Sequence, residues 1–125
     1  MYVPKTIIID NIECLDYKLY TVGLQQVFDM SFIEITLPKE LVLKSNFLEI
    51  INNVEKEIIN LDKQKALEVL EKENTDIQKS KALKQRVSQS LDNLIGFEKN
   101  NSTPYGLRFF LIISKLLSMT NLILL

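Results

Sequence analysis

The sequence has no histidine, a single cysteine and only three glycines. Histidine is the side chain whose pKa lies nearest neutral pH and is also the commonest metal ligand. Without it, a serine or cysteine nucleophile lacks its usual base, and one cysteine with carboxylates makes an implausible zinc site. Gly23, Gly96 and Gly106 lie too far apart to form a phosphate-binding loop. We therefore expect a protein that is not an enzyme, with no cofactor and no catalytic or metal-binding residues.

The lone cysteine and the N-terminus bear on the cellular compartment. Cys14 has no second cysteine with which to form an intrachain disulfide, so a reducing compartment is the simpler expectation. Residues 1–5 lack the basic lead of a signal peptide, and Asp10 interrupts the apolar run that follows them. We expect a cytoplasmic protein.

Length and charge narrow the class further. A chain of 125 residues that is 46% hydrophobic suits one domain, residues 1–125, with a β-rich part over 1–38 and a helical part over 39–125. The net charge of −1 leaves no basic excess to bind phosphates, so nucleic acid is not the expected partner.

The first third of the chain shows the alternation of β-strands. Residues 6–9 are an apolar, β-branched run, and residues 15–21 and 31–37 alternate between apolar and polar positions. The pattern predicts a three-stranded antiparallel sheet over about residues 5–37, with one covered face. In the second strand, one face is expected to hold Leu15, Tyr17, Leu19 and Thr21, and the other face Asp16, Lys18 and Tyr20.

Turn signals separate these strands. Asp10 and Asn11 both tolerate the left-handed conformation that a two-residue hairpin turn requires. Residues 23–30 fit either a loop or a short helical turn. Pro38 ends the third strand, because proline cannot donate to a sheet ladder.

Residues 39–99 show helical periodicity. Asn46 and Glu49 have capping-box spacing, which predicts a helix start. The helix runs either continuously over about 46–73 or breaks near Asp62. Apolar residues recur at steps of three and four at Ile51, Val54, Ile58 and Leu61. After a small rotation the apolar face continues with Ile59, Ala66, Leu67 and Leu70.

A second amphipathic helix follows the polar residues 74–76, with Thr75 as its candidate cap. Its apolar positions are Ile77, Leu83, Val87, Leu91, Leu94 and Ile95. Gly96 is placed to stop the helix, and residues 97–102 to connect it to the end of the chain. The two amphipathic helices form a predicted helical hairpin.

The end of the chain, residues 105–125, holds 14 apolar residues of 21 and no acidic residue. Thr103 and Pro104 provide a helix start. About 20 apolar residues would span a bilayer, but a central Lys115 costs about 2.5–3.5 kcal/mol there. We therefore predict a buried terminal helix, the third of a three-helix C-terminal part. The partner-binding residues expected at its exposed end are Met119, Leu122, Ile123, Leu124 and Leu125.

Charged residues gather in the helical part. Residues 39–99 hold 22 of the 31 charged residues, mixed in sign, which is typical of a solvated outer face and would otherwise be a docking face. The basic cluster Lys79, Lys81, Lys84 and Arg86 spreads around a helix and forms no phosphate-binding stripe.

Three acidic residues lie close together in the sequence at the first turn, namely Asp10, Glu13 and Asp16. Paired carboxylates could serve acid–base chemistry or a hard cation. The alternative is a turn and surface role, which we favour because acidic residues are common in turns for conformational reasons.

Ten residues join the third predicted strand to the helical part: Phe32, Ile33, Glu34, Ile35, Thr36, Leu37, Pro38, Lys39, Glu40 and Leu41. This stretch resembles the strand-to-helix junction of ribbon-helix-helix repressors and antitoxins. The resemblance would imply a dimer whose paired strands lie in the major groove of DNA, with Glu34 and Thr36 facing bases.

Taken together, the sequence predicts a non-catalytic protein-interaction module that acts through a surface, such as a small subunit, inhibitor, immunity or adaptor protein. Its expected partner is another protein or a second copy of itself. The alternatives are a ribbon-helix-helix-like DNA-binding regulator and a protein anchored in a membrane by its C-terminal segment.

Overall fold

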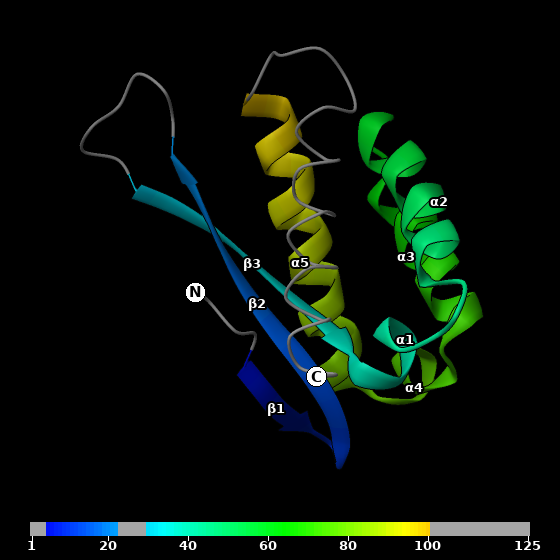
Figure 1. Cartoon of the computed structure of the whole chain (residues 1–125). Helices are drawn as coiled ribbons and strands as arrows, with labels where there is room; N and C mark the ends of the chain where they lie inside the picture. Colours follow the sequence, from blue (N-terminus) through cyan, green and yellow to red (C-terminus); the bar gives the residue numbers. More distant parts are fainter. Residues whose placement is uncertain (1–4, 23–29, 101–125) are drawn as a thin grey trace.

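The computed structural model describes residues 5–22 and 30–100 (Figure 1). The chain begins with a three-stranded antiparallel sheet in the order β1-β2-β3. Its strands are β1 (Lys5–Ile9), β2 (Ile12–Val22) and β3 (Met30–Pro38). Helices follow the sheet, so the predicted α+β class is confirmed.

The β1–β2 hairpin has the predicted two-residue turn. Asp10 and Asn11 have φ angles of 50° and 64°, and Ile9 pairs with Ile12 across them. Two successive residues in the left-handed region match the twist of the flanking strands, which is why this dipeptide closes the hairpin so tightly. Residues 23–29, between the second and third strands, lie outside the described residues.

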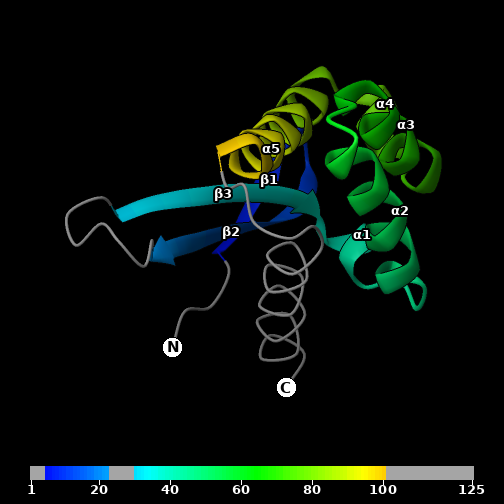
Figure 2. The same ribbon diagram turned by 90° about the horizontal axis from the view of Figure 1, so that it is seen from above.

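Five helices are described over this stretch, where the sequence predicted two, or three with a break near Asp62. They are α1 (Lys39–Val42), α2 (Phe47–Ile59), α3 (Lys63–Glu73), α4 (Thr75–Lys79) and α5 (Lys81–Asn100). The helices α2 and α3 pack against each other, and α5 packs along β3. Figure 2 shows α5 above the sheet, with α2 and α3 to its side.

The break near Asp62 is real. Leu61 ends α2 in the left-handed region, with φ 58°. Its N–H donates to Ile58 O at 3.0 Å, and the Asp62 N–H donates to Glu57 O at 2.8 Å, which satisfies the last carbonyls of α2. Asp62 then begins α3 by accepting from the Lys65 N–H at 3.1 Å.

Two predicted helix ends are wrong, whereas the predicted start of α2 is confirmed. Asn46 is the N-cap residue of α2, although its side chain makes no cap hydrogen bond. Asn74, rather than Thr75, caps α4 by accepting from the Ile77 N–H at 3.3 Å, because its extended backbone places the carboxamide over the first turn. Gly96 lies within α5, which continues to Asn100. A single glycine costs a helix only about 1 kcal/mol relative to alanine, which is too little to end this one.

A single cluster of buried apolar side chains joins the sheet to the helices. Its largest fully buried members include Tyr17 of β2, Ile35 of β3, Ile58 of α2, and both Leu83 and Leu91 of α5. The six apolar residues predicted for the second amphipathic helix are all buried: Ile77, Leu83, Val87, Leu91, Leu94 and Ile95.

The prediction of one covered sheet face is wrong. Cys14, Leu15, Asp16 and Tyr17 follow one another along β2, and each is at most 5% exposed. Because successive strand residues point to opposite faces, both faces of this part of β2 are buried. Apolar and polar residues alternate clearly only in a strand with one face in water. The sequence therefore contains no sign that the second face of β2 is also buried.

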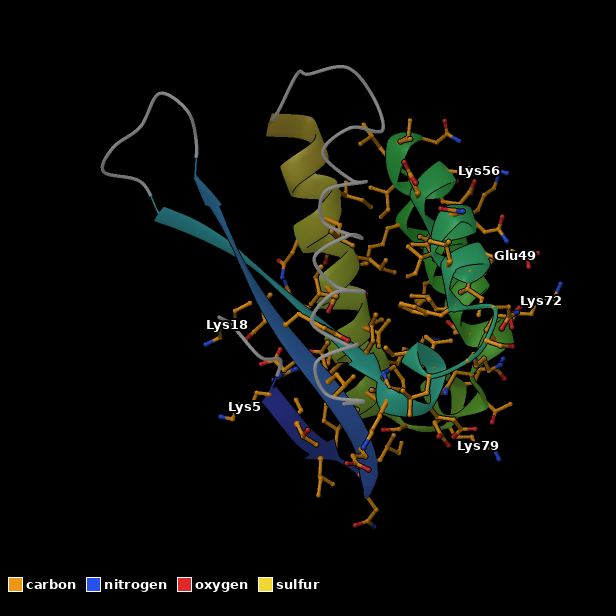
Figure 3. All side chains as sticks on the ribbon, viewed as in Figure 1. Lys5, Lys18, Glu49, Lys56, Lys72 and Lys79 are labelled. Carbon is orange, nitrogen blue, oxygen red and sulfur yellow. The ribbon has the colours of Figure 1, made fainter. Side chains whose placement is uncertain are left out.

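Charged side chains of mixed sign lie on the outer surface of α2 and α3, where Figure 3 shows Glu49, Lys56 and Lys72 pointing away from the sheet. Within the described residues, no helix is both long and apolar enough to cross a membrane. The segment 105–125, with its expected partner-binding residues, lies outside the described residues. The buried terminal helix therefore stays a prediction.

Candidate interaction edge of the sheet

Among the described residues, five buried polar or charged side chains are candidates for chemistry, and each has a structural use. They are Asp16, Thr36, Asn74, Ser80 and Ser90. The Thr36 hydroxyl donates to Asp16 Oδ1 at 3.0 Å. Asn74 caps α4, and Ser80 begins α5 by accepting from the Leu83 N–H at 3.1 Å. In the described part of the chain, no buried side-chain nitrogen or oxygen lacks a hydrogen-bond partner.

The three acidic residues near the first turn do not form one site. Asp10 accepts a hydrogen bond from the Ser80 hydroxyl, which ties the hairpin turn to the start of α5. Glu13 pairs with Lys39 at 3.3 Å, and Asp16 is buried against Thr36. Over residues 5–22 and 30–100, no group of three histidine, cysteine or acidic side chains is arranged to hold a metal ion.

Cys14 is a buried thiol, fully shielded from solvent. Burial raises its pKa above the usual 9.0, an effect that the positive charge of Arg86 partly opposes. A thiol whose pKa is raised by burial carries little thiolate at neutral pH and is a poor nucleophile. Cys14 is therefore a small core residue.

The outer edge of β3 is closed by α5 at Thr36 and Glu34. The Thr36 N–H donates to Ser90 Oγ at 2.8 Å, and the Asn93 side-chain amide donates to Glu34 O at 2.9 Å. Ser90 and Asn93 lie one helical turn apart on α5, so both reach the strand from the same face of the helix. Edge groups that are covered in this way cannot pair with another strand.

The same contact fixes the direction of every backbone group in the sheet. Because Thr36 turns its N–H to α5, its antiparallel partner Asp16 turns its own backbone groups to β1. Asp16 pairs with Lys5, so the backbone groups of Lys5 bond to β2. Alternate residues turn their groups to the same side, so Ile7 and Ile9 bond to β2 as well. In β1, the residues whose backbone N–H and C=O groups point away from the sheet are therefore Thr6 and Ile8.

Among residues 5–22 and 30–100, nothing pairs with the outer edge of β1. Thr6 and Ile8 each present one N–H and one C=O away from the sheet, and none of the hydrogen bonds found among the described residues uses them. Both residues are exposed, and Ile8 is 72% exposed, the highest value among the exposed large apolar side chains Ile8, Leu43, Leu48 and Leu61. Figure 1 shows β1 as the outermost strand, on the side of the sheet away from α2 and α3.

This edge was missed by sequence reasoning. The run Ile7-Ile8-Ile9 identified a strand, but not that the strand lies at an edge or that its middle isoleucine is exposed. The residues through which the ribbon-helix-helix resemblance would reach DNA lie elsewhere in the sheet. Thr36 is 2% exposed and its hydroxyl is held by Asp16, so it presents no hydroxyl to a base.

Comparison with known proteins adds no relative: the chain matches no family model, no curated protein and no solved structure.

Proposed function

We propose that this chain is a non-catalytic protein-interaction module that binds its partner by strand addition at the outer edge of β1. The observation that carries the proposal is the contrast between the two edges of one small sheet. The β3 edge is closed by Ser90 and Asn93, whereas the β1 edge leaves the backbone groups of Thr6 and Ile8 unpaired beside an exposed isoleucine.

Strand addition suits this edge. An added strand would pair with the free N–H and C=O groups, which supply affinity, while side-chain contacts supply specificity. Natural proteins usually protect an open edge with charges, proline or a covering element. In β1 the one charged residue is Lys5, at the start of the strand. An apolar, unprotected edge is expected where a partner covers it.

The test removes the outward N–H without disturbing the hairpin. Ile8→Pro deletes a donor that points away from β2, a position at which an edge strand tolerates proline. Ile8→Thr is the matched control, because it keeps the N–H and a β-branched side chain. Both variants are expected to keep the circular dichroism spectrum of the original chain.

Partner capture is then compared among the three proteins, using extract from the native host and mass spectrometry. A protein retained by the original chain and by Ile8→Thr, but lost with Ile8→Pro, is the expected result. Equal capture by all three would show that the β1 edge is not the binding surface.

A further inference from the structure

We propose that the partner at the β1 edge is a second copy of this chain, joined by antiparallel pairing of β1 with β1 about a twofold axis at Ile7. This inference rests on the proposed function and gives it a specific partner. The result would be a continuous six-stranded sheet built from two copies of the three-stranded sheet.

Only one register uses every free group. With the axis at Ile7, Thr6 of each copy lies opposite Ile8 of the other. Two directly opposite residues whose backbone groups point toward each other form two N–H···O bonds, one in each direction. The two Thr6–Ile8 pairs therefore form four bonds between the copies, and no outward group of β1 is left unpaired. Pairing Thr6 with Thr6, or Ile8 with Ile8, would leave half of these groups without a partner.

The side chains are compatible with this register. Ile7 would lie opposite Ile7 of the second copy, in a pair without mutual hydrogen bonds, where Cα atoms approach to about 4.5 Å and side chains are closest. Ile7 and Ile9 are already half-buried against the core. A second copy would cover their remaining surface, and β-branched cross-strand pairs favour such pairing.

Charge favours the antiparallel direction. Lys5, at the start of β1, would lie opposite Ile9 of the second copy. A parallel pair in register would instead set Lys5 beside Lys5. The antiparallel edge therefore sets no like charges face to face.

The closed β3 edge limits the assembly to two copies. A strand that pairs through one edge of a sheet leaves the other edge of that sheet available for growth, which is the route to fibres. Here Ser90 and Asn93 occupy the β3 edge at Thr36 and Glu34, so each outer edge of the six-stranded sheet would be covered at these two residues. Twofold pairing through a single self-complementary edge is the geometry of a closed dimer.

The dimer should be weak. A five-residue strand is about 17 Å long, and its edge covers only part of the roughly 800 Å² per partner that is typical of stable interfaces. We therefore expect a dissociation constant in the micromolar range. Sedimentation equilibrium of the full chain over a concentration series should show a change from the 14.5 kDa of one chain toward twice that mass.

Charge exchange at the two exposed positions tests pairing through the β1 edge. Thr6→Lys combined with Ile8→Lys sets lysine against lysine in both pairs, and Thr6→Glu combined with Ile8→Glu sets glutamate against glutamate. Each double variant should dimerise at least tenfold more weakly than the original chain. An equimolar mixture should regain the dimer, because every pair then joins opposite charges. The substitutions replace exposed side chains only, and circular dichroism checks that the fold is kept.

The outcomes separate this inference from the proposed function. A chain that stays monomeric at every concentration, or a mixture that fails to dimerise, overturns the second copy as partner. If the original chain then captures a different protein that Ile8→Pro loses, strand addition at β1 stands with another partner. If it captures none, both proposals fall. Open-ended assemblies instead of dimers would overturn the closure by α5.

Discussion

Replacing Ser90 with alanine tests how the β3 edge is closed. Ser90 is 4% exposed, and its Oγ accepts from the Thr36 N–H at 2.8 Å. Its own proton goes to Arg86 O at 2.9 Å, with Thr36 O at the longer distance of 3.5 Å. In Ser90→Ala the Thr36 N–H keeps its place beneath α5 but loses its acceptor.

The expected magnitude follows from two opposing effects. A buried donor left without a partner costs about 1–3 kcal/mol. Alanine is a better helix former than serine by about 0.5 kcal/mol, which offsets part of that cost. We expect Ser90→Ala to lower the free energy of unfolding by about 1–2 kcal/mol, from these two terms together.

Ser88→Ala is the matched control. Ser88 lies on the same helix, is half-buried, and makes no side-chain hydrogen bond within the described part of the chain. It gains the helix preference of alanine without losing a contact, so it should be neutral or slightly stabilising. Urea unfolding followed by circular dichroism measures both variants, and hydrogen exchange reports on the Thr36 amide directly.

Equal stability of the two variants, with unchanged protection of the Thr36 amide, would refute the edge-closing role of Ser90. A further consequence links this role to assembly. If Ser90 closes the edge, the alanine variant should also form species larger than a dimer at high concentration, because β3 becomes a second open edge.

Local signals in the sequence predicted the strands and several of their ends. The strands follow from alternation, and the hairpin from two adjacent residues that tolerate positive φ, Asp10 and Asn11. The division between α2 and α3 follows from Asp62, whose side chain caps the start of α3. In each case the deciding interaction lies within a few residues along the chain.

Contacts between residues far apart in the chain could not be predicted from the sequence pattern. Ser90 and Thr36 are separated by 54 positions, and a serine within an amphipathic helix gives no sign that it will close a strand edge. Asp16 was expected on an outer face, but Thr36 accompanies it into the interior. Burial of a carboxyl depends on a partner that only the folded chain supplies. The open β1 edge could not be identified either, because strand order is set by the whole sheet.

Three further variants test the interior of the fold. Gly96→Ala should raise the free energy of unfolding by about 0.5–1 kcal/mol, because Gly96 lies within α5 and an added Cβ meets nothing within 4 Å. Thermal melting measures this change, and a lower melting temperature would contradict the placement of Gly96 within a helix. Thr36→Val keeps the shape but removes the donor to Asp16, so urea unfolding should show a loss of about 1–3 kcal/mol, and no loss would mean that the bond adds nothing. Cys14→Ala should alter the pH dependence of stability. Burial raises the pKa of the Cys14 thiol, so the folded state keeps its proton to a higher pH than the unfolded chain does. As the pH rises through 9.0, the unfolded chain loses its proton first and gains in relative stability. The original chain should therefore lose more stability than Cys14→Ala between urea titrations on the two sides of pH 9.0, and parallel losses in the two proteins would show that the thiol titrates as freely in the folded state as in the unfolded chain.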